Sequence, residues 1–155
     1  MYRYKLINIY EKYISYPIEV FPSTWDSVGD IAKIGEVISP REVLREIEVR
    51  DDQLYTWARR HITFQKLDSE QQTIVRDIMS KYSALVDLSK PTPEADPFVI
   101  ALAKSKNCIV ITQENYVNLG GPKSKPKIPN VCEAYKVKWI RILDLFKEKG
   151  WQFKS

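Results

Sequence analysis

Three carboxylates occupy positions from which a parallel α/β fold would bring them together. Glu46 follows the short apolar run at 37–39, and Asp96 opens the apolar stretch that leads into a second run at 108–112. Glu114 comes two residues after that second run. Because ligands bind at the carboxyl ends of parallel strands, we expect all three side chains at one edge of the sheet.

Acids in this arrangement would hold a divalent cation. Mg²⁺ and Mn²⁺ are hard ions that bind a few carboxylates together with waters and substrate phosphates. Such an ion activates water and neutralises the charge that develops on a scissile phosphate. Taken singly, each acid also has an ordinary explanation, as a solvated helix glutamate at 46, a helix N-cap at 96 and a loop acid at 114.

The loop after Glu114 is basic and rich in proline. Lys123, Lys125 and Lys127 alternate there with prolines, which hold a chain extended and let the lysines reach phosphates. Residues 123–155 carry nine Lys or Arg and three acids, a formal charge of +6, although the whole chain has only +4. The pattern is compatible with a polyanionic ligand, and an ordinary solvated loop explains it equally well.

The elements that position these residues follow from the spacing of apolar side chains. Apolar residues at three- and four-residue steps predict helices. In the helix that begins near residue 96, Asp96 is expected as the N-cap and Pro97 as the first helical residue. The predicted helices are Phe21–Ile34, Pro40–Val49, a helix capped by Asp51 and Asp52, Asp68–Tyr82, the stretch from Pro97 to Ala103, Val131–Tyr135 and Leu143–Lys149.

Short apolar runs between these helices predict the strands Glu36–Ser39, Cys108–Thr112 and Lys136–Ile142. The second run shows no alternation, which is typical of a parallel strand covered on both faces. Strands that alternate with helices indicate an α/β fold with a central parallel sheet flanked by helices. A chain of 155 residues fits one domain, and we assign residues 1–155 to it.

The composition narrows the functional classes. Cys108 and Cys132 make no metal-ligand spacing with the single histidine, His61, so a zinc site is not expected. The N-terminus lacks an apolar run followed by small residues, and nowhere do eighteen apolar residues stand together. We therefore expect a cytoplasmic protein that does not enter a membrane. The sequence contains no Gly-rich phosphate loop and no nucleophile elbow.

Several longer stretches resemble the PIN-like nucleases, and within them an uncharacterised branch of prokaryotic proteins. The resemblance covers nearly the whole chain. The matching stretches are Tyr16–Pro22 with Trp25, Ile38–Ile47, Ala95–Ala103, Val110–Glu114, Lys127–Cys132 and Lys149–Trp151.

This resemblance implies a three-layer fold, a pocket of acids that binds Mg²⁺ or Mn²⁺, and cleavage of single-stranded or structured RNA. Glu46 looks like the acid on the helix after the second strand, and Asp96 like the acid that opens a central helix. Glu114 looks like the acid that closes the site, and Thr112 like the small polar residue often found just before it. Many relatives are toxins, so the implied partners are RNA and a small antitoxin protein.

The beginning of the chain departs from the family's pattern. The family has a hydrophobic strand that ends in an Asp, a principal metal ligand, followed by a Leu-Ile pair. Here Leu6 and Ile7 can fill the pair, but no acid precedes Glu11. Either the true start lies upstream, or this copy has lost the first strand and its ligand. In the second case cation binding would be weak, because nearby Lys5 opposes it, and Asn8 would offer only a neutral oxygen.

Three functions therefore compete. The first is a metal-dependent endoribonuclease with Glu46, Asp96 and Glu114 as ligands. The second is a nuclease-derived module that has lost catalysis and binds RNA or a protein partner. The third is a structural protein that forms a homodimer through its tyrosine-rich N-terminus, which leaves Asp96 and Glu114 unexplained.

Overall fold

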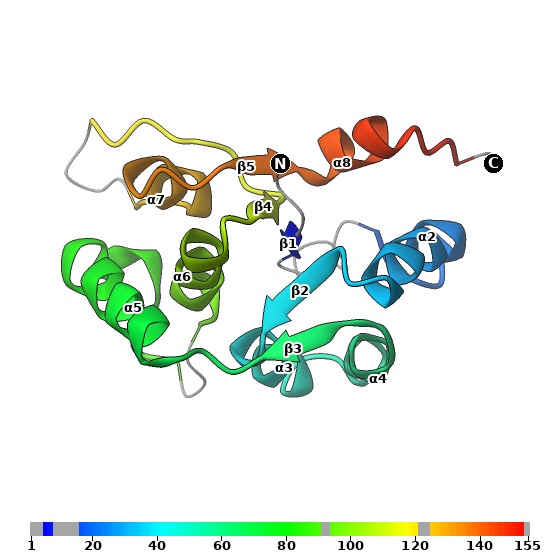
Figure 1. Cartoon of the computed structure of the whole chain (residues 1–155), viewed down its shortest axis with the longest axis horizontal. Coiled ribbons are helices and arrows are strands. Elements are labelled where there is room, and N and C mark those ends of the chain that lie inside the picture. Colours follow the sequence, from blue (N-terminus) through cyan, green and yellow to red (C-terminus); the bar gives the residue numbers. More distant parts are fainter. Residues whose placement is uncertain (1–4, 8–15, 91–93, 121–124, 154–155) are drawn as a thin grey trace.

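Parallel strands form the centre of the protein in the computed structural model (Figure 1), which describes residues 5–7, 16–90, 94–120 and 125–153. Their order across the sheet is β3-β2-β1-β4-β5, so β1 is hydrogen-bonded to β2 on one side and to β4 on the other. Within the described residues the strands are β1 (Lys5–Ile7), β2 (Val37–Pro40), β3 (Thr63–Gln65), β4 (Ile109–Thr112) and β5 (Trp139–Arg141).

The order in which the chain adds strands to the sheet reverses at β1. The chain runs from β1 outward through β2 to β3, and then returns to the other side of β1 with β4 and β5. Ile7 and Ile111 are partners in register, so the carboxyl ends of β1 and β4 lie side by side. In open parallel sheets the crevice outside the strand ends at such a reversal is the usual ligand site.

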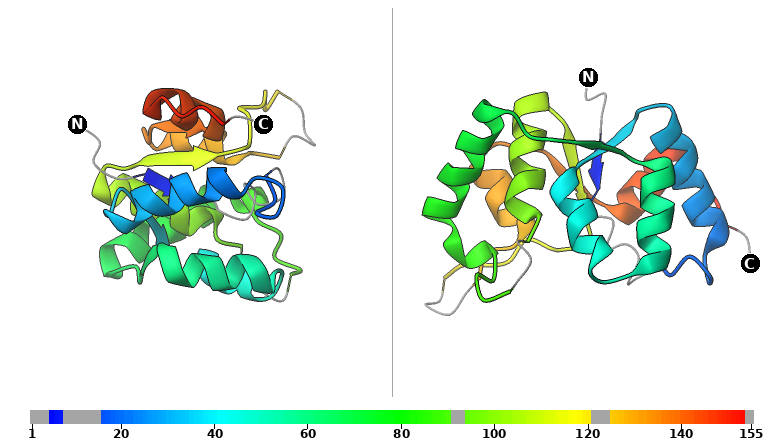
Figure 2. Two further views of the ribbon diagram at one scale, coloured as in Figure 1. Left: turned by 90° about the vertical axis from the view of Figure 1, so that its right-hand side faces the viewer. Right: turned by 90° about the horizontal axis from the view of Figure 1, so that it is seen from below.

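Helices lie along both sides of these strands (Figures 1 and 2). On one side α6 (Asp96–Lys106) packs against β1, β2 and β4, and α5 (Ser69–Lys81) and α7 (Ile128–Ala134) pack on α6. On the other side α2 (Pro22–Lys33) contacts β2, while α8 (Ile142–Lys149) contacts β4 and β5. α3 (Arg41–Glu48) contacts β2, β3 and α4 (Asp52–His61). All residues of β2 and β4 are buried as a result.

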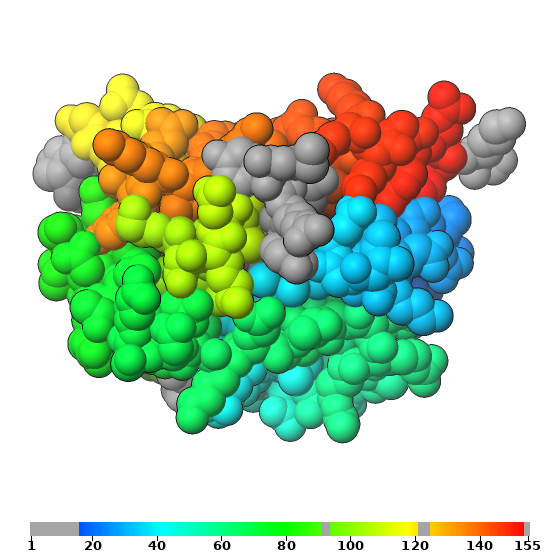
Figure 3. Space-filling model, in the orientation of Figure 1, coloured from blue at the N-terminus to red at the C-terminus, as the bar shows by residue number. Residues whose placement is uncertain are grey.

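The C-terminal segment gives one side of the molecule a positive charge. Figure 3 shows this segment, coloured orange to red, along one edge of the visible face, opposite the green side formed by α4 and α5. Residues 125–153 contain seven Lys or Arg and three acids. The excess of basic residues seen in the sequence therefore remains together in space.

The mixed α/β class with parallel strands is confirmed, and most predicted elements are present near their expected bounds. The short strand β3 was not predicted, because its three residues are exposed or half-buried and carry no apolar run. Helix α7 begins at Ile128, three residues earlier than expected. The expected N-cap of α6 was wrong by one residue, since Ala95 is the N-cap and Asp96 the first helical residue.

The start of the chain also differs from expectation. Lys5–Ile7 forms the central strand β1, a strand that was not predicted from the sequence. The Leu6-Ile7 pair lies inside that strand rather than after it. Asn8 is the residue that directly follows the strand in the sequence, and it lies outside the described residues.

His61 belongs to an aromatic cluster between α2 and α4. Its ring stacks on the Trp57 ring with the centroids 4.7 Å apart, and its Nδ1 is 2.9 Å from the Trp57 carbonyl oxygen. The rings of Trp25 and Trp57 pack in a T-shaped arrangement, with their centroids 4.7 Å apart. Gly29 allows this close approach, because a Cβ there would lie 2.8 Å from the His61 ring. The single histidine is therefore a packing residue, away from the acids discussed above.

None of the helices in the described parts of the chain has both the length and the apolar character needed to cross a membrane.

Candidate functional site

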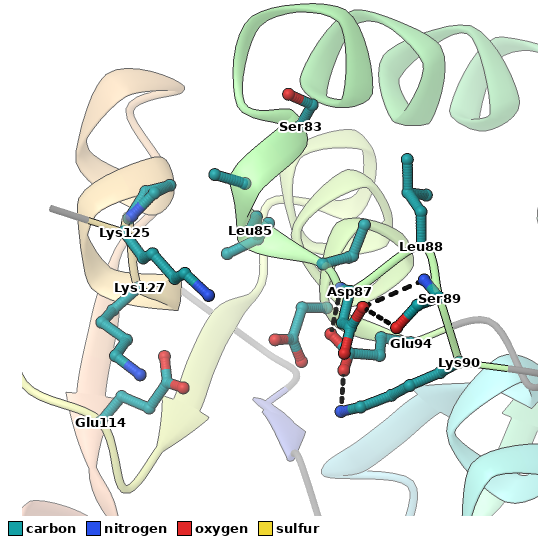
Figure 4. Close-up of a pocket in the computed structure, with 14 residues that line it drawn as sticks. Ser83, Leu85, Asp87, Leu88, Ser89, Lys90, Glu94, Glu114, Lys125 and Lys127 are labelled. Atoms are coloured by element: carbon teal, nitrogen blue, oxygen red, sulfur yellow. Dashed lines mark hydrogen bonds and ion pairs between the residues drawn. The ribbon is translucent and has the colours of Figure 1, made fainter. Parts of the chain in front are cut away.

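A cavity of about 570 Å³ brings together residues from four separate parts of the chain. One wall is the loop 83–90, which follows α5 and begins with the short 3₁₀ helix η1 (Ser83–Leu85). The other walls are Glu94 and Asp96 at the start of α6, Glu114 after β4, and residues 125–127 before α7. In Figure 4, Glu114, Lys125 and Lys127 lie on one side of the cavity and Asp87, Ser89, Lys90 and Glu94 on the other.

Glu114 is held by one hydrogen bond to its backbone and one to its side chain. Its backbone amide donates to the hydroxyl of Thr112 at 3.1 Å, and its carboxylate accepts from the Ile128 amide at 2.7 Å. Thr112 is 1% exposed and does not line the cavity. The threonine singled out by sequence therefore fixes the turn that carries Glu114, while Glu114 itself faces the cavity.

Asp96 lines the same cavity from the first turn of α6. Burial raises the pKa of Cys132, and the negative charges of Asp96, Glu114 and Glu133 raise it further. Asp96 and Glu114 therefore both act on Cys132, and they line one cavity, where a cation would offset their negative charge.

Glu46 is placed differently from the other two acids. Its Oε2 accepts a hydrogen bond of 3.0 Å from the Ala95 amide, and its Oε1 lies 3.9 Å from the Arg50 guanidinium. Its side chain is 14% exposed and is not part of the cavity wall. Ala95 has no side chain that could cap α6, so Glu46 supplies the acceptor at this helix start. Glu46 thus reaches Asp96 through the backbone of its neighbour.

The loop 83–90 carries a hydrogen-bonded network that the sequence did not reveal. One oxygen of Asp87, Oδ1, accepts from the Ser89 amide at 3.0 Å and from the Ser89 hydroxyl at 2.6 Å. These bonds hold the pKa of Asp87 below its usual range. Glu94 accepts from the Asp87 amide at 3.3 Å and pairs with Lys90, which raises the pKa of Lys90. The Asp-x-Ser pattern was the one local signal for this turn.

Asn130 fixes the long loop that brings the lysines to the cavity. Its Oδ1 accepts from the amides of Lys127 and Val117, at 3.1 and 3.3 Å, and its Nδ2 donates to the Val117 carbonyl at 2.7 Å. Asn130 is 5% exposed, so these bonds are shielded from water. Of the three predicted lysines, Lys125 and Lys127 line the cavity, and Lys123 lies outside the described residues.

The acids fit a small cation site rather than a complete cage. No group of three or more His, Cys, Asp or Glu residues suited to a metal ion occurs within the described parts of the chain. Asp96 and Glu114 share one cavity, and one or two carboxylates are what Mg²⁺ takes from a protein when waters and substrate phosphates complete its shell. The donor chemistry therefore suits a hard cation bound together with a phosphodiester.

Comparison with known proteins adds a family but no activity. A family model described as a domain of unknown function (DUF4411) matches residues 6–153, from the central strand to the residues after α8. No curated protein and no solved structure matches the chain.

Proposed function

We propose that this chain, which belongs to the DUF4411 family, is a divalent-metal-dependent endoribonuclease of PIN-like type. The observation that carries the proposal is that Asp96 and Glu114, from separate elements, face one cavity at the strand ends where the sheet order reverses. Two lysines that can contact phosphates line the same cavity. The proposed architecture is the three-layer PIN-like one, which the parallel sheet and the helices along both of its sides support.

Asp96 and Glu114 would hold Mg²⁺ or Mn²⁺ in this mechanism. The bound ion would supply an activated water and neutralise charge on the scissile phosphate. Lys125 and Lys127 bind phosphates of the RNA strand and so position the scissile bond. Glu46 and Thr112 act indirectly: the first fixes the backbone before Asp96, and the second fixes the turn at Glu114.

The test combines titration calorimetry with an RNA cleavage assay. The unaltered chain is expected to bind Mn²⁺ in the micromolar to low millimolar range and to cut a fluorescent single-stranded RNA. Asp96→Asn should abolish detectable Mn²⁺ binding and slow cleavage by about 100-fold or more, because it removes a charged metal ligand.

A matched control is Asp26→Asn, which alters an exposed acid on α2, outside the cavity wall. This variant should bind and cleave as the unaltered chain does. Equal loss in both variants, or no binding and no cleavage by the unaltered chain, would contradict the proposal.

A catalytically degenerate module that binds RNA or a protein is the second candidate function. The observation that favours it is that only two of the three predicted metal ligands, Asp96 and Glu114, line the cavity, whereas Glu46 does not. This candidate predicts that RNA binds in EDTA, weakens when Lys125 and Lys127 are changed to Ala, and stays intact when Mn²⁺ is added. The ribonuclease proposal instead predicts that the RNA is cleaved when Mn²⁺ is added.

We propose the toxin role and an antitoxin partner from the family resemblance alone, and a homodimer from the tyrosine-rich N-terminus. If the chain is a toxin, its expression should arrest growth, and Asp96→Asn should relieve the arrest. Sedimentation of the purified chain would decide between monomer and dimer.

A further inference from the structure

A second cavity, of about 270 Å³, adjoins the first across the loop 83–90. Its walls come from α5, the loop and the first turn of α6, and they are mainly apolar. The side chains that form them include Val75, Met79, Val86, Leu88, Pro97 and Phe98. Figure 4 shows Leu88 pointing away from Glu114 and the two lysines. Val86 and Leu88 line both cavities, so the loop stands between a first cavity of mixed charged and apolar lining and a second cavity of mainly apolar lining.

Polar side chains occur where the two cavities meet. Asp87, Lys90 and Glu94 line both of them. Lys90 and Glu94 are paired with each other, and Oδ1 of Asp87 is occupied by Ser89. Among the residues that the structure describes, no hydrogen bond reaches the other oxygen, Oδ2 of Asp87. The shared rim therefore presents Oδ2 of Asp87 as an acceptor beside a mainly apolar recess.

We propose that the second cavity receives a single unpaired base of the RNA strand whose phosphate lies at Asp96 and Glu114. This inference rests on the proposed ribonuclease function. A base that is splayed out of a single strand is recognised by apolar and aromatic contacts to its faces and by hydrogen bonds to its edge. Phe98 and Met79 supply the apolar contacts, and Oδ2 of Asp87 supplies the acceptor at the edge.

The cavity's size and continuity favour this occupant. A volume of 270 Å³ is room for about nine waters at roughly 30 Å³ each, enough for one planar base. A base linked to a phosphate in the first cavity has to cross only the rim that both cavities share. A base in a duplex stays stacked and cannot reach it, so the substrate is a single strand or an unpaired loop.

The acceptor at the rim makes a prediction about base preference. A carboxylate accepts from an exocyclic amino group, as it does from the N4 amino group of cytosine. Adenine, cytosine and guanine carry such a group, whereas uracil presents carbonyl oxygens there. Cleavage should therefore be about tenfold faster for an amino-bearing base next to the scissile phosphate than for uracil.

Asp87→Asn tests this directly. The side-chain oxygen of Asn can keep both hydrogen bonds to Ser89, so the turn is preserved and only Oδ2 is exchanged for an amide donor. In this variant, cleavage should be about tenfold faster for the RNA with uracil at the variable position than for the RNAs with an amino-bearing base there. The assay uses four fluorescent 12-nucleotide single-stranded RNAs that differ at one position, with binding measured in EDTA and cleavage measured in Mn²⁺.

Phe98→Leu is the second variant, because it keeps a large apolar side chain in a partly buried position and should fold. It should weaken binding of every RNA by about fivefold or more through loss of stacking. Unchanged base preference in Asp87→Asn together with unchanged RNA binding in Phe98→Leu would overturn the proposed base site and leave the ribonuclease proposal standing. If the unaltered chain neither binds nor cleaves RNA, the ribonuclease proposal fails with it.

Discussion

The carboxylate of Glu46 shows how one residue can serve a site without facing it. Its hydrogen bond to the Ala95 amide takes the place of a helix cap and fixes where Asp96 stands. The sequence places all three acids near one sheet edge, and it does not distinguish a ligand from a residue that holds a ligand. The distinction depends on which atoms of the side chain are already bonded.

Two substitutions at Glu46 separate these roles. Glu46→Ala removes the acceptor, and we expect Mn²⁺ affinity and cleavage to fall by about 10- to 100-fold, as for other partners of metal ligands. Glu46→Gln keeps an oxygen for the Ala95 amide and should restore most of the loss. Calorimetry and cleavage rates measure both effects. If Gln were as damaging as Ala, Glu46 would be a metal ligand through its charge.

Tyr135, the residue at the C-cap of α7, connects this helix to α5 and α6. The Tyr135 hydroxyl donates to Asp77 of α5, its ring packs edge-on at 6.1 Å from the Tyr82 ring, and its carbonyl accepts from Lys104 of α6 at 3.1 Å. These contacts keep α7, which follows the lysines and meets Glu114, in place against α5 and α6.

The hydrogen bond from Tyr135 to Asp77 predicts that the stability of the folded protein depends on pH. Tyr135, and then Lys81, hold the pKa of Asp77 below its usual range. A lowered pKa in the folded state adds stability above the unfolded value, about 3.9, and that stability is lost as the pH falls through the folded value. Tyr135→Phe should raise the Asp77 pKa and make the protein unfold at a higher pH during acidification.

Circular dichroism during acid titration measures this shift. Tyr82→Phe is the matched control, because it keeps an aromatic ring beside Tyr135 and does not alter the bond to Asp77. The same acid midpoint for Tyr135→Phe and the unaltered chain would show that the bond does not contribute.

The order of the strands determines which residues meet in the whole molecule. β1 lies between β2 and β4, and its carboxyl end is in register with that of β4. The residue that follows β1 in the sequence is Asn8, an amide that lies outside the described residues.

Asn8→Asp is the corresponding prediction. A third carboxylate at the end of the central strand should strengthen Mn²⁺ binding by about tenfold or more and increase cleavage, because a hard cation favours charged oxygens. Titration calorimetry measures the Mn²⁺ affinity of this variant, and the RNA cleavage assay measures its rate. Unchanged Mn²⁺ affinity in Asn8→Asp would mean that the cation site, if present, does not extend to the end of β1.

Much of the fold follows from the sequence alone. Unbroken apolar runs identified β2 and β4, apolar residues at helical spacing identified the helices, and Asp51 and Asp68 cap α4 and α5 through hydrogen bonds to Leu54 and Gln71. These features depend on residues close in the chain, so local patterns contain them. β3 was missed because an exposed three-residue edge strand leaves no such pattern.

The tertiary structure decided which residues share a site. It placed Asp96 and Glu114 around one cavity, directed Glu46 to the Ala95 amide, and put Asp87 between two cavities. It also made Lys5–Ile7 the central strand, although its length gives little local signal. Each of these outcomes depends on contacts between segments far apart in the chain, and periodicity within a segment carries no information about such contacts. The sequence by itself thus determined the elements and the candidate acids, and only their packing determined which acids meet.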